Sequence, residues 1–206
     1  MKEKVRGRPS KELLAEHQEH LLDIATEEFL EHGFKAASID GIARKAGVGK
    51  LTIYRRFDGK KGLFLAVAEW VLQHGHPLAT VSTEGGSPEQ VLLDFSLAIY
   101  QGITIVRTRE ITRMAVAEAR EFPEVARRYY ESAMVSLEPL VRFLELLDRE
   151  GILSVPDPLR AAIDFTNLTV DGLRFLVMEP LPEEERMGWC TAVIRVFMDG
   201  YRRRSI

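Results

Sequence analysis

Cations, hydroxyls and one aromatic ring cluster in the stretch Ser38–Phe57. If its last eight residues form a helix that buries Ile53 and Phe57, the polar side chains of that helix face outward. These outward side chains are Lys50, Thr52, Tyr54, Arg55 and Arg56. An outer face of this kind suits a DNA groove and the phosphates that line it. The chemistry indicated is therefore binding of a nucleic acid, with no bond made or broken.

Two short helices joined by a tight turn would position these groups. Ser38 is a good N-cap, because its hydroxyl can accept from a free backbone N–H at the start of a helix. Gly47 can close that helix in a left-handed conformation at little steric cost. Between them, apolar residues recur at helical spacing: Ile39, Ile42, Ala43 and Ala46. The second helix begins near Lys50.

The segment 38–57 resembles the helix-turn-helix of TetR-type transcription regulators. The pattern is S-I-x-x-I-A-x-x-A-G-V-S-x-x-T-[LI]-Y-x-x-F-x-x-K-x-x-L, and the resemblance covers roughly residues 10–75. The chain matches it at Ser38, Ile39, Ile42, Ala43, Ala46, Gly47, Val48, Thr52, Ile53, Tyr54, Phe57, Lys60 and Leu63. It departs at Gly49, where Ser is frequent, and at Arg56, where His is frequent. These departures affect which DNA sequence is bound rather than the fold.

On this hypothesis the DNA-facing residues divide into two groups. Contacts to the DNA backbone are expected from Lys50, Thr52, Tyr54 and Lys60, and Ser38 and Arg56 are further DNA-binding candidates. Leu51 would meet a thymine methyl group, and Arg55 would reach a guanine through its two-pronged guanidinium. Arg6 and Arg8 lie in a basic arm before the first helix. The alternatives for that arm are a disordered terminus and a contact to phosphates or the minor groove.

Charge is distributed unevenly along the chain, although the net charge is only −3. Residues 35–61 contain eight lysines and arginines against two acids, and residues 1–11 contain five against one. The first helix between them is rich in acids without a basic neighbour, including Glu28. We expect positive charge to be concentrated on the DNA face and the acids of the first helix to face solvent or turn away from phosphate.

The composition excludes several classes of protein. A single cysteine, Cys190, excludes an internal disulfide and a multi-cysteine zinc site, and neither a cofactor nor a metal is expected. No apolar run approaches the roughly 20 residues that span a membrane, and the N-terminus lacks a signal-peptide core. A cytoplasmic protein is the default. No phosphate loop or nucleophile motif is present, so no catalytic residue is assigned. The alternative is a helical small-molecule-binding protein or enzyme whose N-terminal unit no longer reads DNA.

The helical pattern predicts an all-α fold of about nine helices. An N-terminal three-helix DNA-binding domain occupies 1–78, and a C-terminal helical ligand-binding and dimerisation domain occupies 79–206. The boundary falls at a loop that contains Gly85 and Gly86. A long helix from Pro123 to near Gly151 should be kinked at Pro139, because proline lacks a backbone donor and crowds the preceding turn. The last two helices are expected over 158–178 and 183–200.

These last two helices carry apolar residues on more than one side, so one face can serve the subunit core while another needs a different surface. The resemblance implies a four-helix interface between two subunits, in a homodimer on an inverted-repeat, double-stranded DNA operator. The expected interface residues are Phe175, Trp189, Val193, Val196 and Phe197. The alternative is that both faces are buried inside one subunit.

The resemblance also implies an effector pocket among the helices of the second domain. Candidate lining residues are Phe95, Ile99, Met114, Glu118, Tyr130, Phe165, Asn167 and Thr169. Their aromatic and methionine side chains favour an unknown apolar or amphipathic effector, although each one alone also fits an ordinary core. The function expected is that of a repressor released from its operator by this small molecule.

Overall fold

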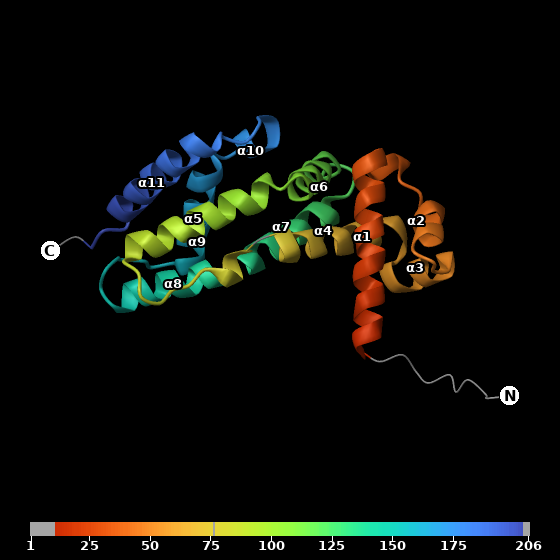
Figure 1. The fold of residues 1–206 in the computed structure, drawn as a ribbon, viewed down its shortest axis with the longest axis horizontal. Helices are drawn as coiled ribbons and strands as arrows, with labels where there is room; N and C mark the ends of the chain where they lie inside the picture. Colours follow the sequence, from red (N-terminus) through yellow and green to blue (C-terminus); the bar gives the residue numbers. More distant parts are fainter. Residues whose placement is uncertain (1–10, 76, 204–206) are drawn as a thin grey trace. The chain divides into compact units, whose positions relative to one another are not determined.

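The computed structural model describes residues 11–75 and 77–203, and within these residues the regular secondary structure is helical. Arg6 and Arg8 lie outside the described residues. The chain divides into two compact units at Val67 and Ala68, and Figure 1 shows the helices of the whole chain. The all-α class is confirmed. In the described part an isolated antiparallel bridge joins Leu153 to Arg202.

The first unit contains three helices and the beginning of a fourth: α1 (Lys11–Ala36), α2 (Ile39–Lys45), α3 (Lys50–Phe57) and α4 (Gly59–Gly75). Aromatic rings from α1 and α4 form the centre of its core. Phe64 meets Phe29 at 5.1 Å and Phe34 at 5.3 Å between ring centroids, in both cases edge to face. Gly33, with φ of 72°, bends α1 so that Phe34 can turn back onto Phe29.

The second unit contains the end of α4 and the remaining helices. These are the short 3₁₀ turn η1 (Pro77–Thr80), α5 (Pro88–Thr104), α6 (Val106–Ala117), α7 (Pro123–Ser136), α8 (Glu138–Arg149), α9 (Pro158–Val170), α10 (Arg174–Val177) and α11 (Glu183–Gly200). α5 packs against both α9 and α11. Phe95, Phe165 and Phe197 are fully buried among them. Cys190 of α11 is also fully buried, and this burial raises the pKa of its thiol.

Two of the nine predicted helices are each divided in the structure, which gives eleven α-helices over the described residues. Pro139 does not kink a continuous helix but lies in the first turn of α8, where its missing N–H leaves no bond unmade. The helix predicted over 158–178 stops at Val170, because Asp171 and Gly172 are both left-handed, with φ of 57° and 55°. A short separate helix, α10, follows them.

Within the described ranges, no helix taken singly combines the length and the apolar composition that a membrane crossing requires. Among the described helices one pair, α5 and α6, meets both requirements when taken together, and the chain bends by 70° between them. No group of three or more His, Cys, Asp or Glu side chains that could hold a metal ion occurs in the described part of the chain.

Candidate nucleic-acid interface

The helix-turn-helix has the predicted inner and outer faces. Ser38 caps α2, its Oγ accepting from the Gly41 N–H at 3.1 Å. On α3, Ile53 and Phe57 are buried, whereas Leu51 and Tyr54 are exposed. Thr52, Arg55 and Arg56 are exposed as well. The side chains expected to meet DNA therefore occupy one solvent-facing surface.

The turn between α2 and α3 depends on glycine. Gly47 has φ of 66°, a conformation that L side chains rarely adopt. It allows the Val48 N–H to donate back to the Ala43 carbonyl at 3.0 Å. Gly49 precedes α3 without a side-chain hydrogen bond to its first turn. The donors at the start of α3 are thus left without a side-chain cap, close to the place where a phosphate is expected.

The predicted DNA-binding cations differ in how they are held. Lys50 forms an ion pair with Asp40 at 2.8 Å, and the Arg56 guanidinium donates to the Gln18 side chain. Lys60 donates to the backbone carbonyls of Lys35, at 2.7 Å, and Ala37, at 3.3 Å. Arg55 has no hydrogen-bond or ion-pair partner among the described residues. Of these four, Arg55 is the cation most available to a base edge, while Lys60 ties the end of α1 to α4.

The prediction that Glu28 has no basic partner is wrong. Instead of facing solvent, Glu28 is 5% exposed and connects α1 to both ends of α2. Its Oε1 accepts from the Ser38 N–H at 3.1 Å, and its Oε2 accepts from Lys45 Nζ at 2.9 Å. The hydrogen bond and charge of Lys45, together with the Ser38 N–H, lower the pKa of this carboxyl despite the opposing effect of burial. The sequence feature that could have indicated this burial is the position of Glu28 between Ala25 and Phe29, on the apolar stripe of α1.

The predicted effector-binding residues do not come together around one cavity. Phe95, Ile99 and Phe165 are fully buried in the core of the second unit, and Thr169 is buried with its Oγ1 3.3 Å from Ser96 Oγ. Met114 and Glu118 are partly buried on and just after α6, while Tyr130 and Asn167 are exposed. The expectation of a single pocket lined by all eight does not fit this arrangement, because the core side chains pack against one another.

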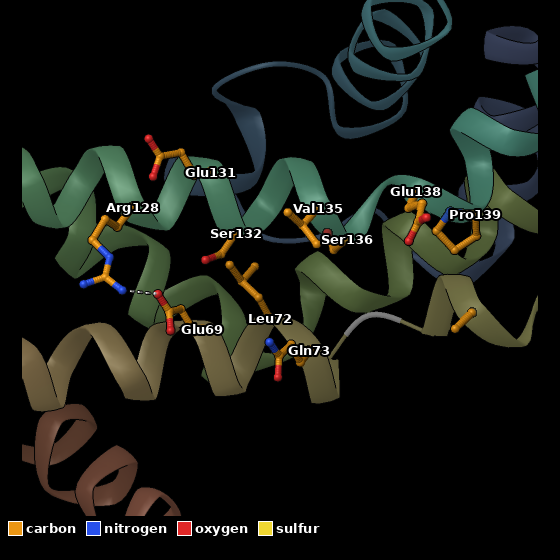
Figure 2. A pocket seen from close by; sticks show the side chains of 11 residues that line it. Glu69, Leu72, Gln73, Arg128, Glu131, Ser132, Val135, Ser136, Glu138 and Pro139 are labelled. Carbon is orange, nitrogen blue, oxygen red and sulfur yellow. Dashed lines mark hydrogen bonds and ion pairs between the residues drawn. The ribbon is translucent and has the colours of Figure 1, made fainter. Parts of the chain in front are cut away.

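The second unit does have a hollow of about 560 Å³ elsewhere, between α4 and α7. Figure 2 shows Leu72 and Gln73 of α4 on one side and Ser132 and Val135 of α7 on the other. An ion pair between Arg128 and Glu69, at 3.3 Å, lies at one end of this α4–α7 hollow. The remaining lining residues are Ala79, Glu131, Ser136, Glu138 and Pro139. The volume is in the range of small-molecule sites.

Only part of the predicted dimer surface is available on the outside of the subunit. Val193 and Phe197 are buried, at 6% and 2% exposure, in the core of the same subunit. Phe175 and Trp189 are partly buried, and Trp189 Nε1 donates to the Thr169 carbonyl at 2.9 Å. Val196 is 60% exposed. Other large apolar side chains exposed on α11, on α10 and beside them are Leu173, Val177, Met178 and Met187.

Two family models match the chain and together cover both units. One is described as bacterial regulatory proteins of the tetR family and matches residues 21–67. The other is described as the C-terminal domain of AefR-like transcriptional repressors and matches residues 90–203, more than half of the chain. The chain belongs to the TetR family. This TetR-family protein is a DNA-binding transcriptional regulator, and members of the family bind DNA operators and act as dimers with small-molecule effectors.

Individual relatives match part of the chain. The regulator is 43% identical over 54 residues to the transcriptional activator FasR of Mycolicibacterium smegmatis, an alignment that covers 26% of this chain and 25% of FasR. It is 25% identical over 135 residues to the transcriptional regulator YvkB of Bacillus subtilis, covering 65% of this chain and 68% of YvkB. The aligned region thus spans only a quarter of the length of FasR.

Solved structures agree over almost the whole chain. A TetR-family regulator from Mesorhizobium loti superposes with a TM-score of 0.79 at 21% identity, covering 95% of this chain and 100% of that one. The flavonoid-responsive regulator FrrA superposes with a TM-score of 0.74 at 26% identity, covering 93% and 100%. At 21% identity, the similarity to the Mesorhizobium loti structure shows only a shared fold.

The lowered pKa of Glu28 makes the stability of this TetR-family regulator depend on pH. Because the folded pKa lies below the ordinary value of 4.5, the carboxylate stabilises the fold above that pH, and this contribution is lost as the pH falls through the folded pKa. Glu28→Gln should therefore lower the free energy of unfolding by about 2 kcal/mol at pH 7. The difference from the parent should shrink below pH 4.5.

Urea unfolding at a series of pH values measures this effect. Glu19→Gln is the matched control, since Glu19 is exposed on the same helix. A Glu28→Gln penalty that stays constant down to the most acidic pH tested would contradict a charged role for this carboxylate.

The available Arg55 leads to a prediction about sequence selectivity. Arg55→Ala should weaken binding to the preferred duplex by about 1–3 kcal/mol and relax the preference at one base pair. Lys50→Ala should instead weaken binding to all duplexes alike. It should also reduce the slope of log K against log salt concentration by about one per subunit. Selection from random duplexes, followed by fluorescence anisotropy at several salt concentrations, separates the two effects. Arg55 does not contact a base if its removal leaves selectivity unchanged.

Proposed function

We propose that this regulator is a homodimeric repressor that binds an inverted-repeat operator and releases it when a small amphipathic molecule occupies the second unit. The observation that carries the proposal is the outward face of α3, where Leu51 and Arg55 are exposed beside the ion-paired Lys50. We assign DNA reading to residues 1–78, and dimerisation and most of the effector site to residues 79–206, with the end of α4 completing that site. We also propose that the protein acts in the cytoplasm without catalysing a reaction.

The inverted repeat follows from twofold symmetry. Two identical recognition helices in a dimer must enter successive major grooves about 34–36 Å apart on one face of the duplex. The exposed apolar side chains on and beside α10 and α11, from Leu173 to Val196, support a partner subunit at this surface. This surface replaces the predicted set, which included the buried Val193 and Phe197. Trp189 and Phe175 would lie at its edge.

For the effector we propose the α4–α7 hollow. Its lining combines apolar Leu72, Val135 and Pro139 with the hydroxyls of Ser132 and Ser136. Such a mixture suits a ligand with an apolar body and a few polar groups. The flavonoid-responsive relative FrrA supports aromatic phenols as the first compounds to screen.

The position of the hollow suggests how the two functions are coupled. α4 begins at Gly59, in the first unit, and contributes Leu72 and Gln73 to the hollow. A ligand that displaces this end of α4 would also act on the residues at its beginning. DNA fixes the spacing of the two recognition helices, so the effector must bind the DNA-free form more tightly.

The test is a reciprocal titration. Compounds from a thermal-shift screen are titrated against the protein with and without its selected operator. We expect operator to weaken effector binding by the same factor by which effector weakens operator binding, typically 5- to 150-fold. Val135→Trp, which fills the hollow from an exposed position, should abolish release with little change in operator affinity. Effector affinity that is identical with and without operator would refute the ligand-release mechanism.

A further inference from the structure

An acid lies among the cations of the surface that we assign to DNA. Asp40 is exposed in the first turn of α2, and its carboxylate holds the ammonium of Lys50, the first residue of α3. Lys50 Nζ is 2.8 Å from Oδ1 of Asp40 and 3.1 Å from Oδ2, so it lies between the two oxygens. The same Nζ is 6.0 Å from the centre of the Tyr54 ring. A negative charge therefore sits beside a lysine that is expected to meet the DNA backbone.

The ion pair between Asp40 and Lys50 contributes little to the stability of the first unit. The two side chains are 67% and 51% exposed, and water screens the attraction between exposed charges. Neither residue belongs to the apolar core, which α2 and α3 complete with Ile42 and Ile53. Asparagine has nearly the shape of aspartate and is also well accepted near the start of a helix. The carboxylate can therefore be removed while the helix-turn-helix stays folded.

A DNA phosphate and the Asp40 carboxylate are rivals for the same ammonium. Both are anions that bind a lysine through its N–H donors, and two anions at one place repel each other. The other held cations of this surface have neutral partners. Arg56 donates to the Gln18 side chain, and Lys60 donates to backbone carbonyls. Of these three cations, Lys50 is thus the one whose present partner directly opposes a phosphate.

We propose that Asp40 limits the affinity of this regulator for DNA by competing with phosphate for Lys50, and that it takes no part in reading the sequence. In the free protein the carboxylate occupies the ammonium, and on a duplex a phosphate displaces it. Because phosphate contacts are alike for every sequence, the competition weakens binding to operator and random duplexes by the same factor. The inference rests on the proposed contact between Lys50 and the DNA backbone.

Fluorescence anisotropy with the selected operator and with a random duplex tests the proposal. Asp40→Asn should tighten binding to both duplexes by about two- to fivefold per subunit, the factor that the contribution of an exposed ion pair corresponds to. The gain should shrink as the salt concentration rises, because screening weakens the ion pair of the parent. In a Lys50→Ala background, Asp40→Asn should have little effect. Asp40→Glu keeps the charge and should bind both duplexes as the parent does.

Glu19→Gln is the matched control, since it removes one negative charge from an exposed position on α1 and should leave the affinity unchanged. The proposal is overturned if Asp40→Asn binds no tighter than the parent, if its full gain persists without Lys50, or if Glu19→Gln gives the same gain. It is equally overturned if Asp40→Asn changes the preference between the duplexes, since Asp40 would then contact a base. If Lys50→Ala binds DNA as tightly as the parent, the proposed contact of Lys50 with the DNA backbone fails as well.

Discussion

Val193→Glu should unfold the second unit. Val193 is buried on α11, in the core that this helix forms with α5 and α9. A carboxylate in this apolar core must either lose its hydration or stay protonated at neutral pH, and both outcomes cost free energy. We expect a loss of at least about 4 kcal/mol, the range of a buried unpaired charge. Urea unfolding followed by circular dichroism measures it.

Val196→Glu is the matched control, because Val196 lies three residues further along the same helix and is 60% exposed. It should retain the helical content of the parent. If the exposed apolar surface on and beside α10 and α11 is the dimer interface, this variant should sediment as a monomer while the parent sediments as a dimer. A folded, monomeric Val193→Glu together with a dimeric Val196→Glu would reverse our assignment of the two faces.

Phe165→Ala should cost about 3–5 kcal/mol, as large-to-small changes of buried aromatic residues do. Phe165 is fully buried, and its ring meets that of Phe197 edge to face at 5.0 Å. Leu168→Ala, on the same helix but partly exposed, should cost about 1 kcal/mol or less. The urea midpoints of the two variants give the comparison. A small loss of stability in Phe165→Ala would contradict a role in core packing and would favour the earlier prediction that Phe165 lines a ligand pocket.

The sequence predicted the first unit well because its local signals agree. Ser38 as a cap, Gly47 in the turn, and Ile53 with Phe57 at helical spacing all indicate the same two helices. The second unit was predicted less closely. Asp171 was not recognised as a helix end, since its left-handed conformation depends on its surroundings as well as on its residue type.

The side-chain contacts were harder to predict than the helices. The position of Glu28 on the apolar stripe of α1 could indicate its burial, but only the fold brings Lys45 and the Ser38 N–H to it. In the same way, apolar periodicity on α11 cannot tell Val193, which faces its own subunit, from Val196, which does not. The α4–α7 hollow joins helices that are distant in sequence, so no local pattern could indicate it.

The single cysteine provides a built-in measure of local opening. Cys190 is fully buried in α11, and its thiol is further protected from reaction because burial raises its pKa. A thiol reagent can then modify the chain only when α11 transiently separates from its neighbours. At low reagent concentration the reaction rate reports the free energy of that opening. Unlabelled protein is therefore enough to follow how DNA or a small molecule changes the dynamics of this helix in solution.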